Sequence, residues 1–290
     1  MTPRPDTRLP DAGQWRPSHR WLIARRLVQA GVLGLFLIGP LTGWWLVKGT
    51  LASSLTLGKL PLTDPFILLQ SLLAGHRPQA AAVIGAGIVA LCYALIHGRA
   101  YCAWVCPVNA ATDGAAWLRR RLGLTDRPLR LSRHARLWVL IGCLAASALT
   151  GTIAWEAVNP ITATYRGLIF GGFGLAALAM GSVFLIDLIA GERSWCGHLC
   201  PVGAFYGLLG RASMIGLAAP RRDACDDCGR CYRACPEPHV LPPVLGKTGP
   251  IGITSVALPD CTACGRCIDV CPQAVFAFRL SPSTIWKLRE

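Results

Sequence analysis

The sequence predicts an integral membrane α-helical protein with four transmembrane helices, followed by a small cysteine-rich α+β domain at the C-terminus. Three observations predict this class. Hydrophobic residues make up 53% of the 290 residues and charged residues only 15%, whereas a soluble domain carries about 25% charged residues. Four apolar runs are long enough to cross a bilayer, and eight of the 14 cysteines are concentrated near the C-terminus.

The four predicted spans follow a basic N-terminal segment, residues 1–26. The hydrocarbon core of a bilayer is about 30 Å thick, and roughly 20 helical residues are needed to cross it. The runs that meet this requirement are residues 27–47, 80–97, 137–157 and 168–190. Together they form a predicted membrane domain, residues 27–190. Between the first two spans, Pro65–Leu73 is apolar but too short to cross, and we expect it to lie in the outer interface.

The basic residues indicate the orientation of the chain. Of the 29 Lys and Arg residues, 25 lie before the first span, in the second loop or after the fourth span, and 4 lie in the other two loops. Positive loops stay on the cytoplasmic side, so we predict a multi-pass protein of the inner (cytoplasmic) membrane with both termini cytoplasmic. Topology and attraction to anionic membrane lipid explain the net charge of +14. The charge therefore gives no support to nucleic acid binding.

One cysteine pattern occurs twice within residues 217–290, the predicted cytoplasmic domain. The copies are Cys225-x2-Cys228-x2-Cys231-x3-Cys235-Pro236 and Cys261-x2-Cys264-x2-Cys267-x3-Cys271-Pro272. This is the spacing of bacterial two-cluster ferredoxins, in which three close thiolates bind one 4Fe-4S cluster and the fourth binds the other. The predicted ligands are Cys225, Cys228, Cys231 and Cys271 for the first cluster, and Cys261, Cys264, Cys267 and Cys235 for the second. Zinc sites are the alternative, but they use paired CxxC units.

Four more cysteines form a second repeat, at the cytoplasmic ends of the second and fourth spans. The copies are Cys102-x3-Cys106-Pro107 and Cys196-x3-Cys200-Pro201. The second copy falls in a predicted membrane-surface segment, residues 191–216. A spacing of four places both thiols of a pair on one face of a helix, and we expect the proline to end that helix. Three interpretations stay open: redox-active thiols, joint ligands of a third metal or cluster site, or cysteines that only pack helices together.

A membrane protein with clusters needs a lipid-soluble electron donor or acceptor, and quinol is the expected substrate. Oxidation of a quinol releases two protons, so ionisable residues at membrane depth are the candidates for its site. We select Glu156, near the outer end of the third span, and Asp187, near the inner end of the fourth; His97 is a weaker candidate. A b-type haem is disfavoured because no histidine lies in the middle of a span.

Beyond the cysteines, the chain resembles the NapH/MauN family of ferredoxin-type membrane proteins. The resemblance rests on Tyr101-Cys102-Ala103-Trp104-Val105-Cys106-Pro107, Trp195-Cys196-Gly197-His198-Leu199-Cys200-Pro201, both ferredoxin runs and Pro61-Leu62-Thr63-Asp64-Pro65, and it covers nearly the whole chain. It implies an electron-transfer subunit of a quinol dehydrogenase, which oxidises ubiquinol. Electrons would pass with a NapG-like periplasmic iron–sulfur protein toward periplasmic nitrate reductase. A membrane-anchored c-type cytochrome is a further implied partner.

Two other functions stay open at this point. A maturation or reactivation factor would deliver electrons to the cofactor of a periplasmic metalloenzyme, and a structural anchor would use the CxxxCP thiols only for packing. The predicted clusters lie on the cytoplasmic side, separated from a periplasmic reductase by about 30 Å of hydrocarbon.

Overall fold

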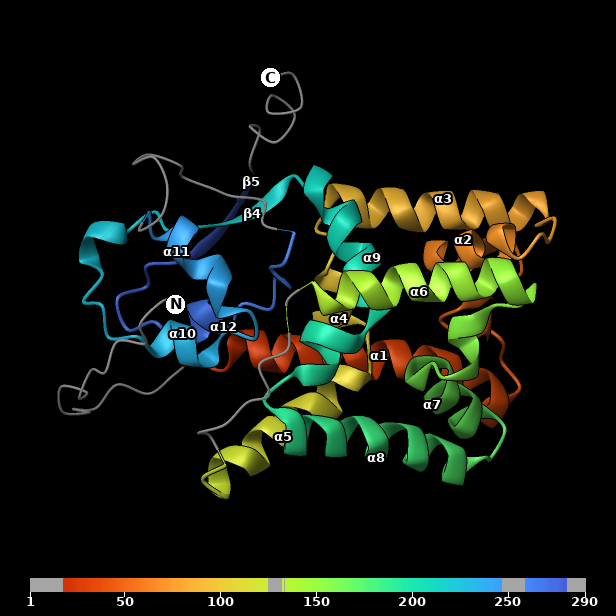
Figure 1. Cartoon of the computed structure of the whole chain (residues 1–290), viewed down its shortest axis with the longest axis horizontal. Coiled ribbons are helices and arrows are strands. Elements are labelled where there is room, and N and C mark those ends of the chain that lie inside the picture. The colour runs from red at the N-terminus through yellow and green to blue at the C-terminus, as the bar shows by residue number, and fades with distance from the viewer. Residues whose placement is uncertain (1–17, 125–131, 133, 247–258, 281–290) are drawn as a thin grey trace.

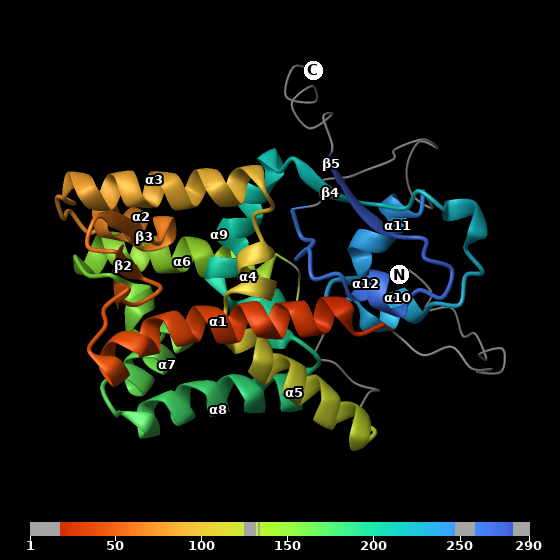
Figure 2. The same cartoon turned by 180° about the vertical axis from the view of Figure 1, so that it is seen from behind.

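A computed structural model of the chain describes residues 18–124, 132, 134–246 and 259–280. The described chain forms two parts that lie end to end (Figures 1 and 2). A larger helical part comes first, and a smaller part with the two ferredoxin runs follows it. The smaller part lies against one end of the long helices, next to the start of α1 (Arg20–Thr42).

Four long apolar helices run side by side in the helical part (Figures 1 and 2). They are α1 (Arg20–Thr42), α3 (Ala80–Leu95), α6 (Ala135–Thr150) and α8 (Phe173–Ala190). Among the described residues, α1 with 23 residues and α8 with 18 are long and apolar enough to cross a membrane. The apolar helices α3 and α6 have 16 residues each. Each predicted span therefore overlaps one of the four helices.

The ends of two helices differ from the predicted ends, and glycine explains both differences. The first predicted span runs to residue 47, but α1 ends at Thr42 because Gly43 adopts a φ of +77°. The third predicted span runs to residue 157, but α6 ends at Thr150 because Gly151 adopts a φ of +66°. A left-handed glycine is a common helix terminator because it lacks the Cβ atom that disfavours this conformation.

Short elements build the end of the helical part that faces away from the smaller part (Figure 1). They are the antiparallel strands β1 (Val47–Gly49), β2 (Ser53–Thr56) and β3 (Leu60–Thr63), then α2 (Pro65–Leu73), a 3-10 turn (Ala154–Ala157) and α7 (Pro160–Ile169). The fourth predicted span, 168–190, is interrupted here because residues 170–172 separate α7 from α8. Helices α2 and α7 begin alike, with a side-chain cap from Asp64 or Asn159 and a proline in the first turn.

Helix α2 packs inside the helical part, and its expected position in the outer interface stays a prediction. It lies between α3 and α6, and its residues Phe66 and Gln70 are fully buried. The Phe66 ring lies 5.5 Å from the ring of Phe205, which belongs to α9 (Pro201–Leu209). The longer helices thus cover the first two turns of α2.

Each CxxxCP motif lies between a long helix and a shorter one. After α3 come α4 (Ala100–Trp104) and α5 (Val108–Arg121), and after α8 come a π-helical turn (Trp195–Leu199) and α9. Helix α5 packs against α8, and α9 packs against α3 and α6. Each short helix therefore contacts the half of the chain that holds the other motif. This reciprocal packing brings both motifs together, near the smaller part (Figure 2).

The smaller part has the predicted α+β composition. Its strands β4 (Ile215–Ala218) and β5 (Ala277–Leu280) pair antiparallel, and its helices are α10 (Arg230–Ala234), α11 (Leu241–Val244) and α12 (Arg266–Val270). Its buried core includes Leu217, Leu241, Val275 and Phe276. Six of the eight cysteines of the two runs belong to this core or pack against it, so the short elements hold the cysteine loops in place.

Candidate functional site

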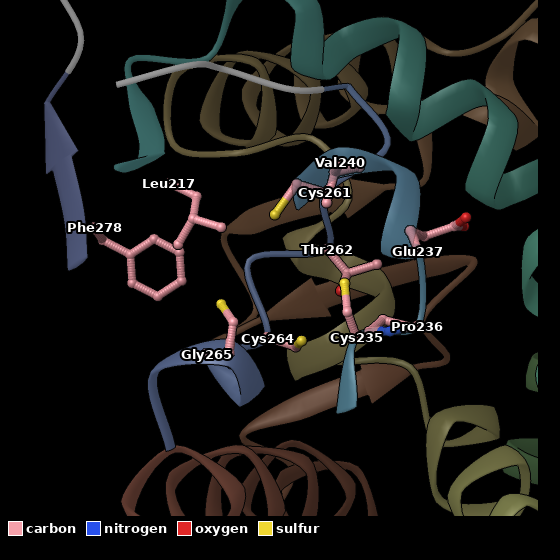
Figure 3. A pocket seen from close by; sticks show the side chains of 11 residues that line it. Leu217, Cys235, Pro236, Glu237, Val240, Cys261, Thr262, Cys264, Gly265 and Phe278 are labelled. Carbon is pink, nitrogen blue, oxygen red and sulfur yellow. The ribbon is translucent and has the colours of Figure 1, made fainter. Parts of the chain in front are cut away.

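The eight cysteines of the ferredoxin runs line two cavities of the smaller part. One, the Cys225 cavity, is lined by Cys225, Cys228, Cys231 and Cys271. The other, the Cys261 cavity, is lined by Cys235, Cys261, Cys264 and Cys267. Each cavity takes three thiols from one run and the fourth from the other. Figure 3 shows the side chains of Cys235, Cys261 and Cys264 around the Cys261 cavity, with Leu217 and Phe278 on one side.

The two runs share one backbone conformation around their second cysteine. Asp227 and Ala263 have φ values of +51° and +49°, and Gly229 and Gly265 have values of +68° and +70°. Left-handed residues in such loops turn backbone N–H groups toward a common centre, which suits an anionic iron–sulfur group. The N–H of Ala263 donates to Sγ of Cys261 at 3.4 Å. The repeated backbone thus offers both thiols and N–H donors to each cavity.

Positive charges surround the Cys261 cavity. Burial raises the pKa of the Cys261 thiol to about 12. At Cys264 burial acts in the same direction, but Arg266 and Arg25 outweigh it and lower the pKa of that thiol. Arg25 comes from α1 of the helical part and Arg266 from α12, so both parts contribute charge that favours a thiolate at this position.

The four cysteines of the CxxxCP motifs come together in one core cluster of the helical part, which we call the four-cysteine layer. Its members are Cys102, Cys106, Cys196 and Cys200. The expectation that each pair of thiols shares one helix face is wrong, because α4 ends at Trp104, before Cys106, and the π-helical turn ends at Leu199, before Cys200. The prolines stand instead at the starts of α5 and α9, where a proline costs no hydrogen bond. Burial raises the pKa of Cys200 to about 12, and Cys102 adds to this increase.

An arginine that the sequence analysis did not select recurs in both motifs. Arg99 and Arg193 each stand three residues before the first cysteine of their motif, and an aromatic residue, Tyr101 or Trp195, stands one residue before it. Both arginines are buried, with exposures of 1% and 7%. The repeat of arginine at one spacing was the signal in the sequence that could have identified them.

Arg99 lies at the junction between the four-cysteine layer and the Cys261 cavity. Its guanidinium donates to the carbonyl of Asp260 at 2.7 Å, to Oε1 of Glu237 at 2.8 Å and to the carbonyl of Cys196 at 3.4 Å. Asp260 immediately precedes Cys261, and Glu237 lines the same cavity. One buried side chain therefore contacts the backbone of both cysteine sites.

Tryptophans form a second link between the two sites. Trp104, which lies between the cysteines of the first CxxxCP motif, donates from Nε1 to the carbonyl of Ala263 at 3.0 Å. Its ring meets that of Trp21 edge to face at 5.9 Å. The Trp21 ring also lies over Gly265, where a Cβ atom would overlap it. The glycine is therefore required by its positive φ and by the close approach of α1.

Comparison with known proteins agrees with these cysteine sets. A family model described as a 4Fe-4S binding domain matches residues 79–125 and 172–219, the two stretches that carry the CxxxCP motifs. A model described as a 4Fe-4S dicluster domain matches residues 224–275, which carry both ferredoxin runs. No solved structure matches the chain.

Curated relatives match most of the chain. The methylamine utilization ferredoxin-type protein MauN of Methylorubrum extorquens AM1 is 54% identical, over 79% of this chain and 79% of its own length. MauN of Paracoccus denitrificans is 53% identical over 80% and 81%, and the ferredoxin-type protein NapH of Escherichia coli K12 is 50% identical over 79% and 79%. The chain belongs to the NapH/MauN family of ferredoxin-type proteins. It is thus an iron–sulfur electron-transfer protein with 4Fe-4S binding domains.

In this NapH/MauN protein, one carboxylate joins the helical part to the smaller part. Asp113 on α5 pairs with Arg26 of α1, with Arg193 and with Arg266 of α12. Burial disfavours the ionised carboxylate, but Arg193, Arg266 and Arg26 outweigh it and lower the pKa of Asp113 to about 2. Four segments that are distant in the sequence therefore meet at a single, partly buried charge cluster.

The structure does not bring the selected quinol-site residues together. Glu156 lies at the end away from the smaller part, where its Oε1 accepts a hydrogen bond from Nδ2 of Asn159 at 2.7 Å. Asp187 is fully buried near the other end of α8 and accepts the N–H of Trp195 at 2.7 Å, so it orients the turn that carries the second CxxxCP motif. His97 is buried, and neither ring nitrogen has a partner among the described residues.

Proposed function

We propose that this NapH/MauN protein is the membrane electron-transfer subunit of a quinol dehydrogenase. It takes electrons from ubiquinol and passes them, with a NapG-like periplasmic iron–sulfur protein and a membrane-anchored c-type cytochrome, toward periplasmic nitrate reductase. The observation that carries the proposal is the series of contacts that runs from the four-cysteine layer, through Arg99 and Trp104, to the Cys261 cavity.

The two cavities of the smaller part are proposed as two 4Fe-4S sites. The ligands are Cys225, Cys228, Cys231 and Cys271 for one cluster and Cys235, Cys261, Cys264 and Cys267 for the other. Four thiols in each cavity, inward N–H groups and nearby arginines fit an anionic cluster. A bound 4Fe-4S cluster supplies one-electron redox chemistry. The chain's own residues hold it, exclude water and set the charge around it.

The four-cysteine layer is proposed as a third cluster site. The match of a 4Fe-4S binding domain to residues 79–125 and 172–219 supports this. These stretches contain one further cysteine, Cys92, which is exposed on α3 and separate from the layer. Among the described residues no three His, Cys, Asp or Glu side chains lie close enough to hold a single metal ion. The choice of a cluster over zinc for the layer rests on the family match.

For the membrane, we propose that α1, α3, α6 and α8 all cross, with both termini and the smaller part on the cytoplasmic side. The corresponding units are residues 1–26, 27–190, 191–216 and 217–290. The distribution of basic residues, 25 against 4, supports this orientation. Membrane helices of 16 residues are short, at about 24 Å, but a bilayer thins locally at modest cost around short helices.

Iron and acid-labile sulfide content per chain, together with EPR of the reduced protein, tests the cluster sites. Three 4Fe-4S clusters give about 12 irons, and two clusters give about 8. A variant with Cys102→Ser and Cys200→Ser is expected to keep about 8. A protein that binds zinc in place of iron would contradict the assignment.

Reduction of the purified protein by a quinol analogue tests the direction of electron flow. We expect bleaching of the cluster absorbance on the timescale of turnover. No reduction by quinol, combined with an immature client enzyme in a deletion strain, would favour the maturation or reactivation factor. Because the relatives include MauN proteins named for methylamine utilization, growth of the deletion strain should be measured with nitrate and with methylamine. Loss of growth on methylamine alone would contradict the proposed delivery of electrons to periplasmic nitrate reductase.

A further inference from the structure

The buried side-chain amide of Gln70 on α2 forms hydrogen bonds through its oxygen but not through its nitrogen. The side chain has no exposed surface, and its Oε1 accepts the backbone N–H of Trp155 at 3.0 Å and lies 3.1 Å from Oγ of Ser147. A backbone N–H can only donate, so the oxygen end of the amide must face Trp155. Nε2 then points elsewhere and has no hydrogen-bond partner among the described residues.

Trp155 provides a second donor of the same kind. Its side chain is 3% exposed, and its Nε1 likewise has no partner within the described chain. Native proteins rarely leave buried N–H groups unpaired, and such groups commonly mark a missing ligand or water. Gln70 and Trp155 are joined by a hydrogen bond, so two unused donors come from neighbouring residues. They lie in the helical part, where apolar surroundings make an unpaired donor costly.

The surroundings of these donors fit a flat aromatic ligand with oxygen acceptors. The Trp155 ring stacks on that of Trp195, with centroids 6.3 Å apart and planes at 29°. Trp195 immediately precedes Cys196 of the four-cysteine layer. Glu156, the next residue after Trp155, carries a carboxylate that accepts a hydrogen bond from Nδ2 of Asn159. Buried apolar side chains of the same cluster, such as Phe66 and Leu140, complete the environment.

We propose that Gln70 and Trp155 bind the head group of a quinone by donating N–H groups to its ring oxygens. The site lies where α2, α6 and the Ala154–Ala157 turn meet. It rests on the proposed function, because it names the place at which that function meets its substrate. Exposed apolar residues of α2 and α6, among them Leu72 and Ile141, provide a surface along which an isoprenoid tail can lie.

Binding of decylubiquinone to the full-length protein in detergent, measured by equilibrium dialysis, tests the site. Trp155→Phe removes the indole N–H together with the five-membered ring, a loss of volume that the control Trp138→Phe shares, and Gln70→Leu removes the amide at similar volume. The matched controls are Trp138→Phe, at an α6 residue that is 71% exposed, and Gln79→Leu, at an exposed residue before α3. One lost hydrogen bond weakens binding by about tenfold. We expect this loss in each site variant and less than a twofold change in each control.

Unchanged affinity in both Trp155→Phe and Gln70→Leu would overturn the inference and indicate that buried water satisfies the two donors. Absence of decylubiquinone binding to the wild type would overturn it as well. If the wild type binds the quinone but a quinol does not reduce its clusters, the proposed function fails while the binding site stands. If Gln70→Leu does not accumulate, Trp155→Phe decides alone, with its iron content as the measure of correct folding.

Discussion

At the scale of single residues, the ferredoxin runs share their cysteines between two cavities, and a buried arginine, Arg99, contacts one of these cavities. The ferredoxin pattern predicts that Cys235 and Cys271 exchange partners, and the two cavities are lined in that way. In the sequence, the only sign of Arg99 is that an arginine stands three residues before the first cysteine in both CxxxCP motifs. Its contact with Asp260 spans 161 positions in the chain, and no local pattern reports such a contact. Tertiary packing decides which arginine is buried beside a cysteine.

Replacement of Arg99 by Met is expected to shift the midpoint potential of one cluster to a more negative value. A buried guanidinium favours the reduced, more anionic state of a nearby cluster. Loss of a charge-assisted hydrogen bond changes that preference roughly tenfold, which corresponds to about 60 mV for one electron. EPR-monitored redox titration checks this, with Arg211→Met at an exposed arginine as control. An unchanged midpoint potential in Arg99→Met would show that Arg99 has only a packing role. Arg99→Lys keeps the positive charge and should therefore keep most of the wild-type potential.

Replacement of Asp113 by Asn is expected to lower the free energy of unfolding by about 2 kcal/mol, because it leaves the buried Arg193 and two partly buried arginines without a counter-charge. The pKa of Asp113 is lowered from 3.8 to about 2. Its stabilising effect is therefore complete above about pH 4 and is lost as the pH falls through 2. Thermal unfolding in detergent between pH 2 and 7 checks both statements. The exposed Asp223→Asn serves as control, and equal melting temperatures for the two variants would contradict the prediction.

At the scale of elements, hydropathy predicts the four long helices but not their ends or the burial of α2. The ends depend on single glycines, Gly43 and Gly151, whose positive φ values stop α1 and α6. Such glycines are visible in the sequence, but apolar residues continue past them and conceal the signal. The burial of α2 has no local signal, because a short apolar stretch suits an interface and a protein interior equally. Only packing against Phe205 of α9 separates the two.

A residue of the smaller part, Asp269, holds the first turn of α1. Replacement of Asp269 should therefore loosen this turn. Asp269 of α12 accepts the N–H groups of Trp21 and Leu22 at 3.3 and 3.1 Å, which replaces a local N-cap. Loss of a helix cap costs about 1 kcal/mol. We expect Asp269→Ala to increase hydrogen exchange at residues 20–24 by roughly fivefold, with Glu192→Ala at an exposed position as control. Equal exchange in the two variants would show that the ring contacts of Trp21 alone anchor α1.

At the scale of the whole molecule, three sets of four cysteines follow one another from the helical part into the smaller part. The four-cysteine layer contacts the Cys261 cavity through Arg99 and Trp104, and the two cavities share one core. The sequence predicts the members of each set, because each set has its own spacing. It does not predict which set lies next to which. The four-cysteine layer lies next to the Cys261 cavity because α1 and α4 pack against the loop around Ala263.

The proposed four crossings can be distinguished from two by alkaline phosphatase fusions, which are active only outside the cytoplasm. Fusions after Gly75 and Gly171 should be active, and fusions after Leu124 and at the C-terminus inactive. If only α1 and α8 crossed, the whole stretch between them would be outside and the Leu124 fusion would be active. The loop between α3 and α6 carries Arg119, Arg120 and Arg121, and the positive-inside rule holds such loops in the cytoplasm. Activity at Leu124 would therefore overturn the four-span arrangement, and activity at the C-terminus would place the smaller part on the other side.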